Sequence, residues 1–304
     1  MKTFLNLKHL MSFVLICSTT LLMSQEKEKA SIADVVYKDY KEKGIDSALE
    51  RYAKLKEKEA ATYKIDEWEL NRIGYKIMHE DQDLEAAEKV FSLNIKEYPE
   101  AANPNDSYAD YLIVAGNEEE AKKYLKKSIS MTKQGKGTLD DTRLYQGSLG
   151  KLARLENRHA QLDFLVGEWD LDLKNMNNGK VVSQNKEINK IYYDEEHGIL
   201  TADFIGPDGT PFAKRVLAYD AVDDEFDVVY IGSNQMLGLW PSTIKVKDLG
   251  NDAYEAIEEY TDDNKEQVSL RHEIRKIDEN TLEWNIFNEA EGGQVASMNF
   301  KRRQ

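Results

Sequence analysis

Hydrophobic and polar positions change their spacing near residue 160 of the chain. Between residues 30 and 135, apolar residues recur at i, i+3, i+4 and i+7, which predicts a series of amphipathic helices. From Leu162 onward the period falls to two, because Trp169, Leu171 and Leu173 alternate with acidic residues. The sequence therefore predicts an α+β chain of two domains, with helices first and an antiparallel sheet second.

The helical region contains a repeated unit. Predicted helical hairpins cover residues 69–91 and 106–125, and a more divergent hairpin covers residues 32–52. Small residues are expected where two helices touch, and large residues where a gap between helices is filled. The small positions are Gly74, Ala87, Ala109 and Ala121, and the large positions are Ile77, Phe91, Leu112 and Leu125. Equivalent alanines in the two clearer units, Ala87 and Ala121, lie 34 residues apart.

This period and residue pattern resemble the tetratricopeptide repeat, and we assign residues 25–135 to such repeats. The stretch 65–131 is also similar to the short repeat tail of many exported bacterial hydrolases. Stacked repeats present a concave surface, so the resemblance implies a groove that binds a partner protein or peptide. A packing module that braces the second domain or forms a dimer is an equal alternative. The candidate groove residues are Tyr37, Tyr40, Asn71, Tyr75 and Tyr108.

Helical spacing resumes after two glycines, Gly135 and Gly137. Leucines such as Leu144 and Leu152 continue the pattern, so residues 136–159 are expected to form a linker with a capping helix rather than a flexible tether.

Residues 160–304 carry the pattern of a closed β-barrel. About ten short runs alternate apolar and polar residues without intervening helices, and turn signals such as Asn177-Asn178-Gly179 separate them. A meander of this kind is expected to close on itself, because closure removes the exposed edges. After the first strand, the predicted strands are 186–193, 198–205, 212–219, 226–231, 242–246, 253–260, 267–277, 281–288 and 294–301.

The opening of this region, residues 162–170, contains Gly167 and Trp169 in a Gly-x-Trp motif at the start of the first strand. It resembles the calycin superfamily, which includes the lipocalins and fatty-acid-binding proteins, and more specifically bacterial lipocalin-like domains of unknown function. The resemblance implies that a basic residue of the last strand, Arg302 or its neighbour Arg303, stacks over the tryptophan and seals one end of the barrel.

Barrels of this class and size hold a small apolar ligand, so the inward positions are the candidate binding site. His272 shares a strand face with Val268, Leu270 and Ile274, which predicts that it points inward. A ligand contact, or a haem ligand as in haem-binding relatives of the barrel class, is one interpretation. A core histidine bonded to a neighbouring side chain or carbonyl is the other. The remaining candidate ligand-binding residues are Trp240, Trp284 and Met236.

The first 24 residues have the pattern of a signal peptide. A basic start precedes the apolar stretch 10–23, which is shorter than the ~18–20 residues that a membrane-spanning helix needs. We therefore expect cleavage near Ser24, a periplasmic or secreted location, and no stable membrane insertion afterwards. Cys17 is the single cysteine and would be removed with the signal peptide.

Charge narrows the set of partners. The 304 residues include 41 Lys and Arg against 56 Asp and Glu, a net charge of −15. This balance argues against a sequence-independent nucleic-acid partner, because such binding needs a basic surface. No spacing suits zinc or calcium, and no catalytic motif is present, so we predict neither a metal site nor catalytic residues. Acidic pairs such as Glu258-Glu259 are interpreted as solvated turns or edges.

These patterns favour an exported, non-enzymatic binding protein whose repeats dock a partner protein and whose barrel holds a small apolar ligand. A ligand-free envelope scaffold with a solidly packed barrel is the first alternative. An enzyme, such as a hydrolase, that pairs His272 with a nearby carboxylate is the second alternative, and it requires an inward-facing acid that the pattern does not identify.

Overall fold

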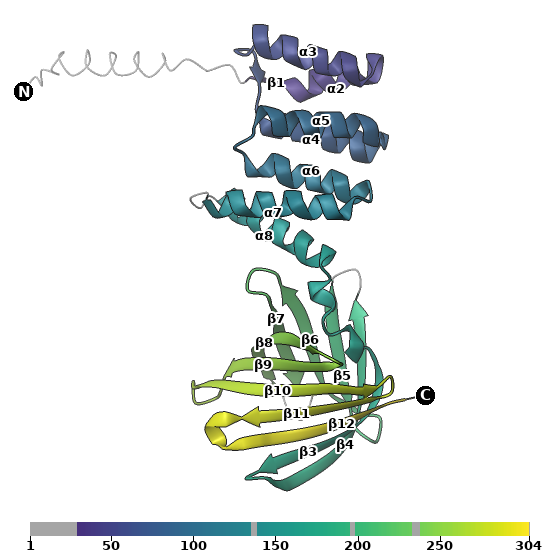
Figure 1. The fold of residues 1–304 in the computed structure, drawn as a ribbon, viewed down its shortest axis with the longest axis vertical. Coiled ribbons are helices and arrows are strands. Elements are labelled where there is room, and N and C mark those ends of the chain that lie inside the picture. The colour runs from purple at the N-terminus through teal and green to yellow at the C-terminus, as the bar shows by residue number, and fades with distance from the viewer. Residues whose placement is uncertain (1–28, 135–138, 195–197, 233–237, 304) are drawn as a thin grey trace, which may run out of the picture. The chain divides into compact units, whose positions relative to one another are not determined.

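The computed structural model describes residues 29–134, 139–194, 198–232 and 238–303. Helices come first and strands second, which confirms the α+β layout (Figure 1). The predicted signal peptide, residues 1–24, and Met236 lie outside the described residues. The chain divides into two compact units, Met1–Tyr111 and Leu112–Gln304.

The first unit is helical, and its helices lie close to the residue ranges predicted for the hairpins. The elements of this unit are β1 (Ala30–Ser31), α2 (Ile32–Lys43), α3 (Ile45–Lys58), β2 (Tyr63–Lys64), α4 (Glu67–Lys76), α5 (Leu84–Glu97) and the start of α6 (Ala102–Val114). A two-residue parallel bridge joins β1 to β2.

The small and large positions of the repeat pattern are buried, as predicted. Gly74 of α4 shows why size matters there, because a Cβ at this position would lie 2.7 Å from the ring of Phe91 in α5. The missing side chain lets the phenylalanine pack directly against the α4 backbone. Between these helices the chain forms a π-helical turn, Ile77–Asp81, and Gln82 adopts a left-handed conformation. The connection between α4 and α5 is thus partly helical.

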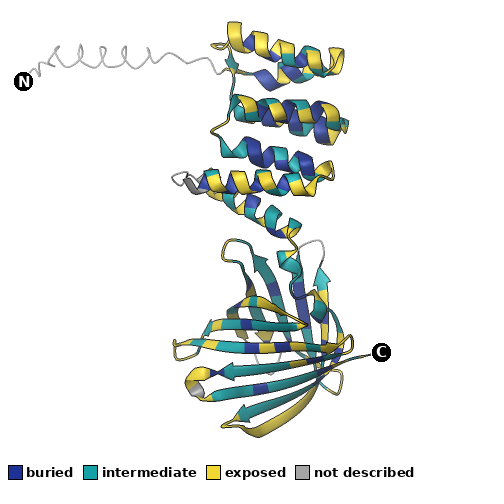
Figure 2. Ribbon diagram, in the orientation of Figure 1, coloured by how far each residue is buried: buried dark blue, intermediate teal, exposed yellow. Residues whose placement is uncertain are grey.

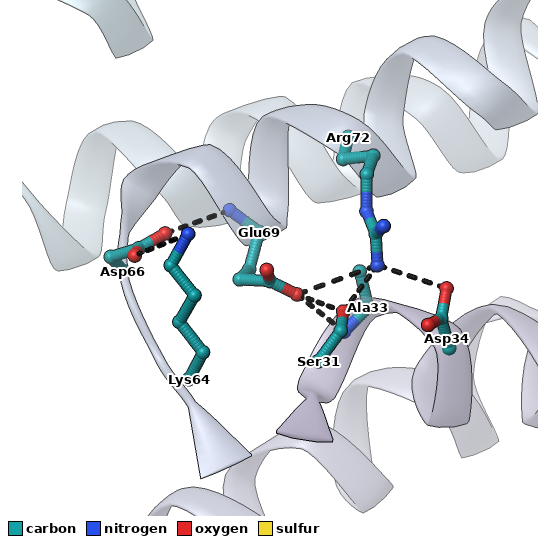
Figure 3. Close-up of polar contacts among 7 residues, drawn as sticks. All are labelled: Ser31, Ala33, Asp34, Lys64, Asp66, Glu69 and Arg72. Carbon is teal, nitrogen blue, oxygen red and sulfur yellow. Dashed lines mark hydrogen bonds and ion pairs between the residues drawn. The ribbon is translucent and has the colours of Figure 1, made fainter. Parts of the chain in front are cut away.

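A carboxylate from α4 caps α2 (Figure 3). Ser31 is the N-cap of α2, but its side chain makes no capping bond. Instead Glu69, which is 6% exposed, accepts hydrogen bonds from the Ala33 N–H at 3.0 Å and from the Ser31 hydroxyl. Arg72 pairs with Asp34 at 2.9 Å beside it. A negative charge at a helix N-terminus is favourable, so Glu69 ties the first helix pair to the second.

The second unit begins within α6 and ends with the barrel. A buried contact of 3.2 Å between Ser128 Oγ and Ser148 Oγ joins its two long helices. The helices are α7 (Glu118–Gln134) and α8 (Leu139–Leu155), and the strands are β3 (Gly167–Asn177), β4 (Lys180–Asp194), β5 (Ile199–Ile205), β6 (Pro211–Asp220), β7 (Glu225–Gly232), β8 (Gly238–Gly250), β9 (Ala253–Thr261), β10 (Gln267–Asp278), β11 (Thr281–Asn288) and β12 (Gly293–Arg302).

Strands β3 to β12 form a closed antiparallel barrel, in which β12 pairs with β3. This confirms the predicted meander of about ten strands. In β3, Trp169 and Leu171 are buried and the residues between and beside them are exposed or only partly buried, and burial varies along the other strands as well (Figure 2). The β3–β4 turn carries the residues predicted for it, since Asn178 and Gly179 both have positive φ.

One end of the barrel is filled by Trp169. Its indole Nε1 donates to the Leu165 carbonyl at 2.7 Å, and the Arg302 guanidinium lies 4.1 Å over the ring centroid. Arg302 also donates to the Val166 carbonyl at 2.9 Å. Gly167 has φ +144°, and a Cβ there would lie 2.0 Å from Arg302 Nη1. Glycine is therefore required where the chain enters β3, both for the conformation and for the close approach of the arginine.

Candidate functional site

The strand register defines which side chains face the inside of the barrel. The buried Trp169 lies opposite Asn189 of β4, so both side chains are on the inner face of the barrel. Every second residue along a strand, and its partner on the next strand, lies on this same face. Most residues on this face are apolar, but a small set is polar or charged. This polar set includes Glu187, Asn189, Arg215, Ser242, Glu258 and His272.

Apolar side chains of the interior line a cavity of about 90 Å³. Alanines at Ala202 and Ala256 leave room that larger side chains would fill, and Trp284 and Phe204 form part of the wall. Among the lining residues, the polar side-chain groups are those of Asn189 and Arg215 and the indole N–H of Trp284. The barrel is therefore hollow in its middle and mostly apolar around the void.

Glu258 is the centre of the polar cluster. Its Oε1 contacts the Arg215 guanidinium and accepts a hydrogen bond from Ser242 Oγ at 2.7 Å. Its Oε2 lies 3.3 Å from His272 Nε2, an electrostatic contact rather than a hydrogen bond. The Glu258 side chain is only 12% exposed. The sequence-based interpretation of Glu258 as a solvated edge residue is thus wrong, since the register of β9 turns it inward.

The neighbours of Glu258 determine its charge state. Burial by itself would raise the pKa of this carboxyl, but the positive charge of Arg215 and the contacts with His272 and Ser242 outweigh burial. Together they hold the pKa of Glu258 well below its usual range. The carboxylate therefore stays ionised and balances the guanidinium inside the barrel.

Trp284 orients His272. The indole Nε1 of Trp284 donates to His272 Nδ1 at 2.9 Å, and an indole N–H can only donate. The lone pair of the imidazole is therefore on Nδ1, and its proton is on Nε2, facing Glu258. His272 is 1% exposed and inward, as the strand pattern predicted, and it has the side-chain partner that the core-histidine interpretation requires.

This arrangement does not resemble a nucleophilic relay. Ser242 donates directly to Glu258, not to the histidine, and Nδ1 of His272 is occupied by the indole. A serine nucleophile needs a base that accepts its proton and a third group that orients this base. Glu258 is the inward-facing acid that an enzyme pairing His272 with a carboxylate would require. In this structure Glu258 is the counter-ion of Arg215.

A haem ligated by His272 does not fit these residues. Both imidazole nitrogens face protein groups, and the ring is not among the side chains that line the cavity. The cavity of about 90 Å³ is also well below the roughly 300–1,000 Å³ of pockets that hold larger ligands.

Two polar nitrogens at the cavity wall are unsatisfied. Across the described ranges, neither Asn189 Nδ2 nor Arg215 Nε has a hydrogen-bond partner, although both atoms are buried. Asn189 is 2% exposed. Buried donors without partners are rare in folded proteins, because each costs about 1–3 kcal/mol of desolvation. These two donors are the feature of the cavity that most needs an explanation.

Aromatic side chains connect the cavity wall to the surface. The ring of Phe204 lies 5.6 Å from that of Tyr230, which lies 5.8 Å from that of Trp240. Trp240 is 39% exposed, and a Cβ on the nearby Gly238 would come within 2.8 Å of its indole. Of the predicted ligand residues, Trp284 lines the cavity and Trp240 lies nearer the surface. His272 points inward but is not among the residues that line the cavity.

The candidate groove tyrosines of the helical unit hold neighbouring helices together. Three of them donate their hydroxyls to aspartates that come later in the chain, and these bonds join Tyr37 to Asp81 at 2.8 Å, Tyr40 to Asp83 at 3.0 Å and Tyr75 to Asp110 at 2.7 Å. The ring of Tyr108 stacks on that of Tyr111 with centroids 5.6 Å apart. Asn71 is buried and accepts a hydrogen bond from Asn94 at 2.7 Å, so its amide faces the helix pair and not the solvent.

Among the residues that the structure describes, no three His, Cys, Asp or Glu side chains gather as a metal site would require. Within the same ranges, no helix combines the length and apolar character needed to span a bilayer.

Comparison with known proteins yields solved structures alone. No protein-family model matches the chain, and neither does any curated protein. The M. tuberculosis protein Rv2717c is 14% identical to this chain, with a TM-score of 0.33. The match covers 48% of this chain and 98% of the Rv2717c chain. A redesigned β-barrel, b11L5F_LGL, is 11% identical, with a TM-score of 0.25 and coverage of 47% and 94%. A second redesigned barrel, mFAP1 bound to DFHBI, is 12% identical, with a TM-score of 0.24 and coverage of 46% and 96%. These similarities are too low to carry a functional argument.

Proposed function

We propose that the barrel binds a small, largely apolar molecule in its interior. The observation that carries this proposal is the cavity of about 90 Å³, walled by apolar side chains that include Trp284 and Phe204. Dry apolar cavities of similar order bind small apolar molecules, as an engineered cavity of about 150 Å³ binds benzene. The expected ligand is therefore the size of a small ring or a short chain.

Filling the cavity tests this proposal. Ala256 is buried at the cavity wall on β9, whereas Ala253 lies on the outer face of the same strand. Ala256→Leu should fill the void, and Ala253→Leu makes the same change outside it. The probe is methylenecyclopentane, and the readout is the shift in thermal unfolding of the full chain.

A probe that binds only the folded state stabilises it, by about 2.7 kcal/mol at a hundred times its dissociation constant. Wild type and Ala253→Leu should both be stabilised, and Ala256→Leu should not. Equal stabilisation of all three proteins would place the probe elsewhere. A wild type that the probe does not stabilise would favour the ligand-free scaffold.

The helical region and the export signal complete the proposal. We infer an exported binding protein in which the repeat-like helices dock a partner protein while the barrel holds the ligand. The repeat pattern of residues 32–125 and the signal-like residues 1–24 support these two roles. Recovery of the processed chain from the periplasm or medium of an exporting host tests the location.

A further inference from the structure

The unsatisfied donors at the cavity wall describe the ligand more closely. This inference rests on the proposed function, because it concerns the molecule that occupies the same cavity. Asn189 and Arg215 supply the polar groups of the wall besides the indole N–H of Trp284, which is already bonded to His272. The open positions on both residues are nitrogens. Arg215 Nε can only donate, so the complementary group on a ligand is an acceptor.

The charges around the cavity oppose an anionic acceptor. The guanidinium of Arg215 already contacts the Glu258 carboxylate, so its charge is balanced within the protein. A second carboxyl, Glu187, lies on the inner face in register with Leu171, a residue of the cavity wall. A carboxylate ligand would add negative charge beside these acids without a free counter-ion, which is costly in an apolar interior. A cationic ligand would present N–H donors, not the acceptor that Asn189 Nδ2 and Arg215 Nε lack.

We propose that the cavity takes an apolar molecule with one neutral hydrogen-bond acceptor, such as the carbonyl of a ketone, ester or amide, and that Asn189 and Arg215 Nε recognise this acceptor. The hydrocarbon part of the ligand contacts the apolar wall. The acceptor satisfies donors that the protein leaves open, so binding removes a desolvation cost as well as adding a contact.

The test compares two probes of nearly the same shape in three proteins. Cyclopentanone carries the carbonyl, and methylenecyclopentane replaces its oxygen with a CH₂ group. Asn189→Leu removes the amide at similar volume, and Arg215→Lys keeps a positive charge near Glu258 while removing the Nε–H. Dissociation constants are measured by calorimetry or saturation-transfer NMR. Cyclopentanecarboxylate is the anionic comparison.

Asn189→Leu should weaken cyclopentanone about tenfold, as expected for the loss of one hydrogen bond to a buried donor, and should leave methylenecyclopentane within about twofold. Arg215→Lys should act in the same direction. Retained hydrocarbon binding shows that each variant still folds with its cavity intact.

Other results overturn one claim or the other. If both probes bind wild type and the two variants weaken them equally or not at all, the acceptor proposal fails while the proposed function stands. Tighter binding of cyclopentanecarboxylate than of cyclopentanone would contradict the neutral class. If neither probe binds wild type, the proposed function itself fails.

Discussion

The pairing of Glu258 with Arg215 predicts a large cost for removing one charge. Glu258→Gln keeps the shape of the side chain and the acceptor for Ser242, but it leaves the guanidinium without its counter-ion in the barrel interior. Breaking a buried pair in this way costs about 3–5 kcal/mol. The side chains of Glu258 and Arg215 are 12% and 19% exposed, so we expect the lower end, about 3 kcal/mol.

A double-mutant cycle separates the pair from its surroundings. Arg215→Met should cost a similar amount, because it leaves the carboxylate unpaired. The double variant Arg215→Met with Glu258→Gln should cost less than the sum of the two single variants, with a coupling free energy of about 2 kcal/mol or more.

Urea unfolding of the full chain at pH 7 measures these free energies. Trp68 lies in the helical unit, so total fluorescence reports on more than the barrel. Hydrogen exchange of the β9 and β10 amides therefore assigns the loss to the barrel. Glu289→Gln is the control, because it removes an exposed partner of Arg271 on the outside of β10. A cost for Glu258→Gln no larger than for Glu289→Gln, or additive single variants, would refute the reasoning.

Three further predictions concern the Glu258 carboxyl, the contact between Arg302 and Trp169, and the Glu69 cap. The folded-state pKa of Glu258 is depressed below the ordinary carboxyl value of 4.5. The contribution of this carboxylate to stability is therefore complete above pH 4.5 and is lost as the pH falls below that value. Urea titrations over this acidic range should show a shrinking stability difference between wild type and Glu258→Gln. Arg302→Met should destabilise the barrel by about 1 kcal/mol through the lost cation–π contact with Trp169, and unchanged stability would contradict a sealing role. Glu69→Gln should lower the free energy of unfolding by about 1 kcal/mol and speed hydrogen exchange of the Ala33 amide, because the group that caps α2 loses its charge. An unchanged exchange rate at Ala33 would argue against the cap.

The fold was predictable because its signals are local. Alternation located the strands, although β4 and β8 begin earlier than predicted, at Lys180 and Gly238. The turn residues Asn178 and Gly179 carry the positive φ that a tight hairpin needs. In the helical unit, spacing and residue size identified Gly74 as a small contact position and Phe91 as a large filling position, and the structure packs the two together. Each of these features depends on residues within one element or one hairpin.

The polar cluster was missed because it depends on contacts between distant residues. Glu258 meets Arg215 from 43 positions away in the chain, and no local pattern links the two. An acidic pair on a strand is usually solvated, so composition alone favours the outward interpretation. The alternation of Tyr254, Ala256, Glu258 and Tyr260 contains the missing signal, since it places the acid on the same face as the buried alanine.

The cavity was expected only in general terms. The resemblance to ligand-binding barrels implied an interior ligand, but the void depends on how the side chains of all ten strands fill the barrel. Ala202 and Ala256 leave the space, and neither stands out in sequence from a residue that packs against a larger neighbour. The open nitrogens of Asn189 and Arg215 are likewise visible only once every possible partner is placed.

The most direct test of a hollow barrel with a mostly apolar cavity is a crystal of the protein under xenon pressure. Xenon enters apolar cavities and scatters anomalously, so its position can be read without a known ligand. The account predicts a xenon peak among Ala202, Ala256 and Trp284, which is absent in Ala256→Leu. An interior without xenon, filled by side chains or by ordered water, would contradict the central claim.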